Sequence, residues 1–344
     1  MSRPALTSSA SPEEGLTGSV EDVPRAISPG LTMGDRVFRH GSAAVGVTVL
    51  GITGAIGVFL GYQSIPTLSR YGLHFFIENQ WNPDNDVVGI SAVLLGTVQV
   101  AFLALIMAFP LALASALFIT EYAPVRIRSA LVSLIDLMAA IPSIVWGLWG
   151  FFLIEPEAIG VARWLAQHMS WVPIFHVDTD PGAALWAQTR FTASVFIASF
   201  PVAMMILPMA AAVMRGVFAQ APAAEREAAL ALGGTQWGAI RTVVIPFGRG
   251  GIIGGTMLAL GRALGETIAV LLIISPAFDL KIRPLEVGTE TVSALIAGRF
   301  GEATSAQLSA LLTAGFVLFL LTLFVNTVAA VFVNRSRSGS ATEL

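Results

Sequence analysis

The chain has 344 residues, of which 55% are hydrophobic and 12% are charged, with a formal net charge of −3. Soluble domains carry about 25% charged residues, so half that charge content, with apolar residues in long blocks, predicts a polytopic membrane protein. The chain has no cysteine, which excludes disulfides and cysteine-based metal sites. Four scattered histidines lack the spacing of metal ligands, and no basic stripe indicates nucleic-acid binding.

The first 40 residues are rich in Ser, Pro, Gly and acidic residues, and no apolar segment typical of a signal peptide stands at the start. We therefore expect a disordered cytoplasmic tail over residues 1–40. A second short cytoplasmic tail is expected over 336–344. The membrane domain between the two tails is expected over 41–335.

Six apolar segments are long enough to cross a bilayer core of about 30 Å. In lipid each must be helical, because its backbone groups can pair only within the segment. The third carries Asp136 and Pro142, and the fifth carries Arg262 and Glu266. The predicted spans are approximately 42–61, 93–119, 129–154, 191–214, 251–275 and 308–333.

Arginine and lysine near the helix ends predict the orientation, because cytoplasmic loops carry an excess of both. With the N-terminus inside, the cytoplasmic segments hold ten such residues and the longer outer loops hold six. The short loop between the second and third spans is the strongest evidence for this orientation, because Arg126 and Arg128 are its only charges besides Glu121. Both termini are therefore expected to be cytoplasmic, and residues 215–250 lie on the same side.

The polar interval 215–250 predicts two short helices lying on the membrane surface. Pro222 suits the first position of a helix, and Gly233-Gly234 supplies a stop in which a left-handed residue is needed. Thr235 then caps a second element, which Pro246 ends before the fifth span. An amphipathic interfacial helix of no special function remains an alternative reading of this interval.

The spacing within this interval is more specific than its composition. Glu227-Ala228-Ala229 is followed after three residues by Gly233, and after nine more by Val243-Val244-Ile245-Pro246. This pattern resembles the "EAA" loop of ABC importer permeases, which reads E-A-A, three residues, G, nine residues, I-x-L-P. The resemblance implies that Glu227, Ala228, Ala229, Gly233 and Pro246 form the cytoplasmic surface that docks an ATPase.

Arg262 and Glu266 are four residues apart, so on a continuous helix they share one face. A charge near the middle of the bilayer costs at least about 2.5–3.5 kcal/mol and is a candidate functional residue. A guanidinium can bind two oxygens of an oxyanion, so the pair could line a translocation path; a pair that only fixes packing is the alternative. Asp136 is a lone carboxylate for which a structural role and a place in the path stay equally open.

No catalytic residue and no metal site are predicted, because no Ser/His/Asp set and no metal-ligand cluster stand in the sequence. A G-x-x-x-x-G-K-[ST] phosphate-binding loop is also missing. A pump driven by ATP would therefore draw its energy from another chain. We expect a transport subunit without enzymatic activity and without a cofactor of its own.

Further motifs resemble the phosphate-import branch of type I ABC permeases. They are Thr120–Pro124, Ala140–Gly147 and Gly261–Thr267; Phe75–Pro83 and Ile268–Val270 look more like the PstC-type than the PstA-type subunit. The resemblance covers about residues 40–335. Trp146 departs from it, since Tyr is more usual there, and the loop from Glu155 to Arg190 is long and has no assigned counterpart.

The resemblance implies an all-α, MetI-like fold of six transmembrane helices in a bacterial plasma (inner) membrane. It also implies a heterodimer with a PstA-like permease, two ATP-binding subunits that hold ATP-Mg, and a periplasmic or lipid-anchored phosphate-binding protein. Sulfate and molybdate importers share the fold. A proton-coupled secondary transporter using Glu266, or a membrane enzyme using Asp136, Arg262 and Glu266, are further alternatives.

Overall fold

The computed structural model describes residues 33–177, 191–274, 278 and 280–336. These residues are helical almost throughout, apart from a small antiparallel pair, β1 (Trp81–Asn82) and β2 (Val87–Val88). The chain divides into two units, 1–53 and 54–344. The expected tails over 1–32 and 337–344 lie outside the described residues, but helix α1 begins at Met33, so a disordered tail as far as residue 40 is wrong.

Helix α1 (Met33–Tyr71) is about twice as long as the span expected over 42–61. Its second half, from Gly54 onward, packs against α14 (Ser305–Ser336) within the larger unit. There the Thr67 hydroxyl lies 2.8 Å from Ser309 Oγ, which in turn donates to the Gln63 carbonyl at 2.8 Å. These polar contacts join the C-terminal end of α1 to the N-terminal end of α14.

Helices α3 (Ser91–Leu117) and α7 (Val195–Phe218) form the centre of the larger unit. Alanines on one face of α3 are almost fully buried, and their small side chains let α7 approach closely. The stripe consists of Ala101, Ala104, Ala108, Ala112 and Ala116. Helix α11 (Arg249–Leu264) packs on α7 and on α14. Helix α3 covers the predicted segment 93–119 as far as Leu117, after which η2 follows, and it begins two residues earlier than predicted, at Ser91.

A single third helix over 129–154 is wrong. The chain instead forms α4 (Val125–Ala140), a break at Ile141-Pro142, α5 (Ser143–Trp149), a π-helical turn η3 (Gly150–Ile154) and α6 (Glu155–His168). Proline lacks an N–H and disfavours helix in the residue before it, which explains the break. The membrane-length apolar helix is Ser143–His168. Of the predicted loop 155–190, the part 178–190 lies outside the described residues.

The fifth span is also divided. Four short elements come before it: α8 (Ala223–Ala231), α9 (Gln236–Ala239), the π-helical η5 (Ile240–Val244) and α10 (Ile245–Phe247). The helical stretch Gln236–Phe247 meets α11 at an angle of 67°. Helix α11 ends at Leu264, and α12 (Ile268–Ile273) follows after a break. In the described part of the chain, five helices are long and apolar enough to cross a membrane, or six if the bent pair counts as one.

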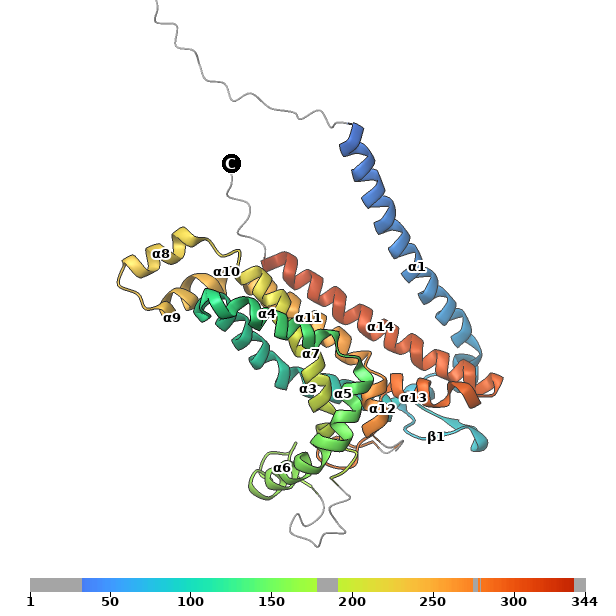
Figure 1. The fold of residues 1–344 in the computed structure, drawn as a ribbon. Helices are drawn as coiled ribbons and strands as arrows, with labels where there is room; N and C mark the ends of the chain where they lie inside the picture. Colours follow the sequence, from blue (N-terminus) through green and yellow to red (C-terminus); the bar gives the residue numbers. More distant parts are fainter. Residues whose placement is uncertain (1–32, 178–190, 275–277, 279, 337–344) are drawn as a thin grey trace, which may run out of the picture. The chain divides into compact units, whose positions relative to one another are not determined.

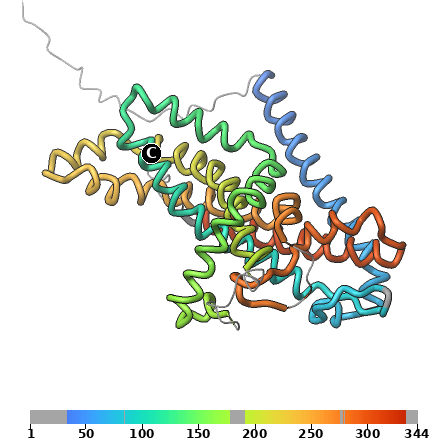
Figure 2. Tube along the Cα trace, turned by 60° about the horizontal axis from the view of Figure 1, so that its bottom comes forward, coloured from blue at the N-terminus to red at the C-terminus, as the bar shows by residue number. Residues whose placement is uncertain are grey.

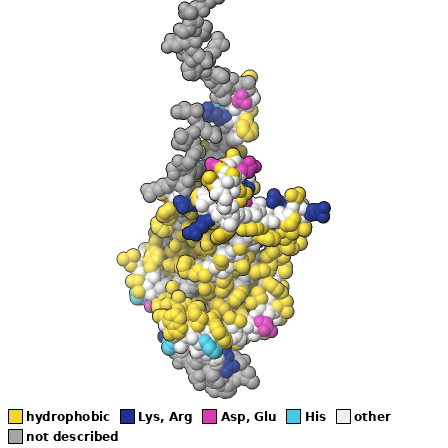
Figure 3. All heavy atoms as spheres, turned by 90° about the vertical axis from the view of Figure 1, so that its left-hand side faces the viewer, with side chains coloured by type: hydrophobic (Ala, Val, Ile, Leu, Met, Phe, Trp, Pro, Cys, Tyr) yellow, Lys and Arg dark blue, Asp and Glu magenta, His cyan; other side chains and the backbone are white. Residues whose placement is uncertain are grey.

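The two ends of the larger unit differ. Helices α8 and α9 project at one end, beside the end of α3, which finishes in a π-helical turn η2 (Phe118–Tyr122). At the other end a small second core joins the β pair, α2 (His74–Ile77) and α13 (Val292–Arg299) to the starts of α3 and α14. The short turns η1 (Pro83–Asn85) and η6 (Phe300–Glu302) lie in the same segments of chain but are not part of this core. Between the two ends a broad band of hydrophobic side chains faces outward, and basic side chains gather along one edge of it (Figure 3).

Candidate coupling surface and translocation residues

Helix α8, which carries the E-A-A sequence, has no buried residue, and all of its residues except the part-buried Arg226 and Ala229 are exposed. Pro222 precedes it, as predicted, and the helix ends in a left-handed turn at Gly233, whose φ is +82°. The Gly234 N–H donates to the Ala229 carbonyl at 3.1 Å and the Gly233 N–H to the Leu230 carbonyl at 3.0 Å. This is the paired bond pattern of a Schellman C-cap, for which glycine is the favoured residue. The predicted corner is confirmed.

The second element begins as predicted. The Gly238 N–H donates to Thr235 Oγ1 at 3.1 Å, so Thr235 caps α9. Ile240 and Val244 are then fully buried and join the central core. Pro246 does not end this element, because helix continues through α10 and the bend comes at Gly248. The loop therefore has an exposed first helix and a second one anchored by apolar packing.

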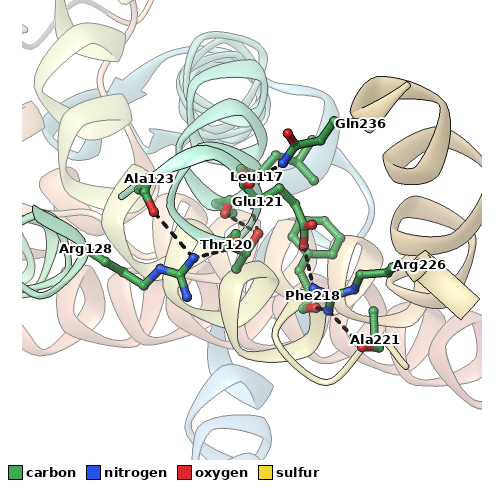
Figure 4. Close-up of polar contacts among 10 residues, drawn as sticks. Leu117, Thr120, Glu121, Ala123, Arg128, Phe218, Ala221, Arg226 and Gln236 are labelled. Carbon is green, nitrogen blue, oxygen red and sulfur yellow. Dashed lines mark hydrogen bonds and ion pairs between the residues drawn. The ribbon is translucent and has the colours of Figure 1, made fainter. Parts of the chain in front are cut away.

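A cluster of polar side chains joins this loop to the end of α3 (Figure 4). Arg226 Nη1 on α8 lies 3.3 Å from Glu121 Oε1 in η2. Gln236 Nε2 on α9 donates to the backbone carbonyl of the same Glu121. Sequence reasoning does not pair Glu121 with Arg226, because Glu121 lies within the motif Thr120–Pro124 and Arg226 within the separate polar interval 215–250.

Two further arginines make polar contacts at the same end of the bundle, one with backbone carbonyls and one with a carboxylate. Arg128 in the first turn of α4 donates from Nη2 to the Thr120 carbonyl at 3.0 Å and to the Ala123 carbonyl at 3.5 Å (Figure 4). Arg215 in the last turn of α7 lies 3.8 Å from Asp136 Oδ1. The Asp136 side chain is 58% exposed, and its cationic neighbour is thus Arg215 rather than Arg262.

Arg262 and Glu266 do not share a helix face, because α11 ends at Leu264 between them. Arg262 lies exposed in the last turn of α11. Glu266 is buried, and its Oε1 accepts the Ala269 N–H at 3.2 Å at the start of α12. The expected i, i+4 pair is replaced by an Arg that makes no ion pair within the described chain and a Glu that caps the next helix.

Two motifs that suggested the family meet in space. A Cβ on Gly147, at the end of Ala140–Gly147, would lie 2.8 Å from the Ala269 Cα, which belongs to Ile268–Val270. Only glycine permits that approach between α5 and α12. The break after α11 is therefore fixed from both sides, by the Glu266 cap and by the packing of α12 on α5.

Glu290 is a second buried carboxyl, and it lies at the opposite end of the bundle from the loop 215–250. It lies in the loop between α12 and α13, outside the membrane-length helices, and is 3% exposed. Burial raises its pKa to about 7, and the nearby Arg299 opposes that rise only in part. In the described residues no group of three or more His, Cys, Asp or Glu side chains is arranged to hold a metal ion.

Comparisons with known proteins point in one direction. Residues 108–338 match the family of binding-protein-dependent transport system inner membrane components. The chain is 36% identical over 300 residues to "Phosphate transport system permease protein PstC 2" of Mycobacterium tuberculosis, covering 86% of this chain and 90% of the relative. It is 36% identical over 304 residues to "Phosphate transport system permease protein PstC" of Pasteurella multocida, covering 87% and 91%.

A solved structure supports the fold. It is the crystal structure of a bacterial alginate ABC transporter in complex with an alginate pentasaccharide-bound periplasmic protein, with a TM-score of 0.50 at 16% identity over 91% of this chain and 99% of that chain. The expected all-α, multi-pass importer fold is confirmed. The chain belongs to the inner-membrane components of binding-protein-dependent transport systems and, among them, to the PstC permeases.

Proposed function

We propose that this chain is the permease subunit of an ATP-driven inorganic phosphate importer and forms half of its translocation path. Its curated relatives are named for phosphate transport, which favours phosphate over sulfate or molybdate and over a proton-coupled carrier. The observation that carries the proposal is the exposed helix α8, which bears Glu227-Ala228-Ala229 and ends in a rigid corner at Gly233. If α8 fits into a groove on a partner subunit, the exposed surface of α8 becomes buried.

The partners follow from the family. We propose that two ATP-binding subunits hydrolyse ATP-Mg, that one of them docks on α8, and that a PstA-like permease completes the channel. A phosphate-binding protein delivers substrate from the periplasmic side. Arg128, Arg215 and Arg226 gather at the end that carries α8, and this supports a cytoplasmic position for that end and for both termini.

Arg262 is the proposed contact for the anion. It is exposed on this chain in the last turn of an apolar helix and has no ion-pair partner among the described residues. An uncompensated guanidinium in that environment is costly unless it faces water or a partner chain. A single fork of N–H donors binds an oxyanion without enclosing it, and weak binding lets the anion leave again. Glu266 holds the break beside it.

Reconstitution tests this proposal. The complete complex in proteoliposomes, supplied with a phosphate-binding protein, should take up labelled phosphate only when ATP-Mg is present on the ATPase side. Uptake of sulfate or molybdate at equal concentration should be far lower. Uptake that persists without ATP, or that a protonophore abolishes, would assign the chain to a proton-coupled carrier instead.

A further inference from the structure

The helix that presents E-A-A has very little apolar hold on the rest of the molecule. No residue of α8 is buried and Ala229 is only part-buried, so packing of apolar side chains holds α8 weakly and is a poor route for passing its displacement to the membrane helices. Arg226 is the side chain of α8 that reaches back to the bundle (Figure 4). It lies next to the exposed Glu227 but is itself only 26% exposed.

Arg226 connects α8 to two different membrane helices. Its Nη2 donates to the carbonyls of Phe218 at 3.1 Å and Ala221 at 2.8 Å. Phe218 ends α7, where backbone carbonyls lack helical partners and the helix dipole favours a cation. The Nη1 atom of the same guanidinium lies 3.3 Å from the Glu121 carboxylate at the end of α3.

Glu121 is enclosed more tightly than its partner. Its side chain is 8% exposed, and removing a carboxylate from water is costly unless a cation lies against it. Gln236 on α9 donates to the Glu121 backbone carbonyl, so both short helices of the loop are tied to one residue. The Arg128 contacts to Thr120 and Ala123 brace the same turn from the side of α4.

The loop therefore has two separate attachments. The apolar one, through Ile240 and Val244, leads along the chain into α11. The polar one, through Arg226 and Glu121, leads to α3, which is about 100 residues earlier in the sequence. Two attachments on different helices convert a displacement of the loop into a movement of α3 relative to α11, which a single attachment would not do.

We propose that Glu121 and Arg226 form a rigid strut that transmits movement of the coupling loop to α3, distinct from the surface of α8 that docks the ATPase. Glu121 and Arg226 are positioning residues in this scheme, since neither contacts substrate or nucleotide. The proposal rests on the proposed function, because the strut has a role only if α8 receives force from an ATPase. It requires α8 and the end of α3 to move as one body throughout the transport cycle.

The first test uses Glu121→Gln in the reconstituted complex. Glutamine keeps the size of the side chain and removes the charge that holds Arg226. We expect the ATPase to co-purify and hydrolyse ATP at the wild-type rate, while phosphate imported per ATP falls at least about tenfold, or about 1.4 kcal/mol of coupling. Glu302→Gln is the matched control, because Glu302 is an exposed carboxylate in η6, at the opposite end of the bundle from α8; its import per ATP should equal that of wild type.

The second test uses the absence of native cysteine. Glu121→Cys with Arg226→Cys places two thiols at the strut and nowhere else in this chain. Without cross-linking, import per ATP should be as low as in Glu121→Gln. A short bifunctional thiol reagent should restore it to within about twofold of wild type, since a covalent link replaces the ion pair. This readout also decides the question if Glu121→Gln fails to accumulate in the membrane.

The outcomes separate the strut from the function. Wild-type import per ATP in Glu121→Gln, or a cross-link that blocks transport, would overturn the strut while leaving the importer intact. A wild-type complex that binds no ATPase or imports no phosphate would overturn the proposed function itself.

Discussion

The corner at Gly233 offers the sharpest test of the docking surface. Its φ is +82°, and a Cβ placed there would have no atom within 4 Å. Substitution therefore causes no clash with neighbouring groups, and its cost is confined to the backbone. A left-handed conformation costs an L-residue roughly 1–2 kcal/mol, and a β-branched residue is the worst case. Gly233→Val should lower the equilibrium constant for forming the corner by a factor of roughly 5–30.

The ATPase should bind more weakly in proportion, because an apparent Kd rises as the binding-competent fraction falls. We expect the Kd for the ATP-binding subunit, measured on permease complexes in lipid nanodiscs, to rise severalfold in Gly233→Val, with roughly 30-fold as the upper bound. Gly233→Asn is the matched control, since asparagine tolerates the left-handed region, and its Kd should stay close to wild type. Equal affinity of Val, Asn and wild type would show that docking does not depend on this corner.

Three further predictions concern single charged groups. Arg262→Gln should reduce ATP-driven phosphate uptake roughly 10-fold or more, the worth of a charge-assisted hydrogen bond, with ATPase docking unchanged and with Arg262→Lys closer to wild type; undiminished uptake in Arg262→Gln would remove Arg262 from the path. Asp136→Asn should change stability by no more than about 1 kcal/mol, because its pair with Arg215 spans 3.8 Å and is exposed, and a tenfold loss of uptake would instead place Asp136 in the path. Glu290 has a folded-state pKa raised from 4.5 to about 7, so its contribution to stability is present below pH 4.5 and is lost as the pH rises through 7. That loss of stability is on the order of 3 kcal/mol. The Tm of the wild-type protein should therefore fall as the pH rises from 5 to 8, and the Tm of Glu290→Gln should change less; an equal fall in both would assign the pH dependence to another group.

The coupling loop could be predicted from the sequence because its signals are local. Pro222, Gly233 and Thr235 each act on their own turn of backbone, and the structure has a helix start, a corner and a cap where they stand. Pro246 misled because proline is compatible with the first turn of a helix. In the structure it sits at the start of α10, and the bend falls two residues later.

The errors in the membrane region have a different cause. Hydropathy measures whether a segment is apolar, and it does not detect a break inside an apolar segment. Pro142 divides the third predicted span. The fifth ends at Leu264, where Gly265 could have warned of a helix end. The i, i+4 relation of Arg262 and Glu266 depended on an unbroken helix and failed with it.

The strut could not have been predicted from the sequence. Glu121 and Arg226 are 105 residues apart and belong to separate elements. Their contact depends on where α3 ends and on how α8 leaves α7, and neither follows from periodicity. The charges themselves were visible, but each had an ordinary explanation as a residue of a cytoplasmic loop.

The alanine stripe on α3 has a mechanical consequence. The side chains of this stripe are single methyl groups, so the surface that α3 presents has no large projections. Helix α3 can therefore slide along α7 by a fraction of a turn without large side chains of its own leaving their packing sites. Such small sliding movements between packed helices are shear motions. Toward the other end of the same contact, Ser199 Oγ lies 3.4 Å from the Val100 carbonyl. The interface therefore combines a low-relief alanine surface toward the end that carries α8 with a hydrogen bond at Ser199 farther along. A small displacement at the first end can then tilt α3 about the second.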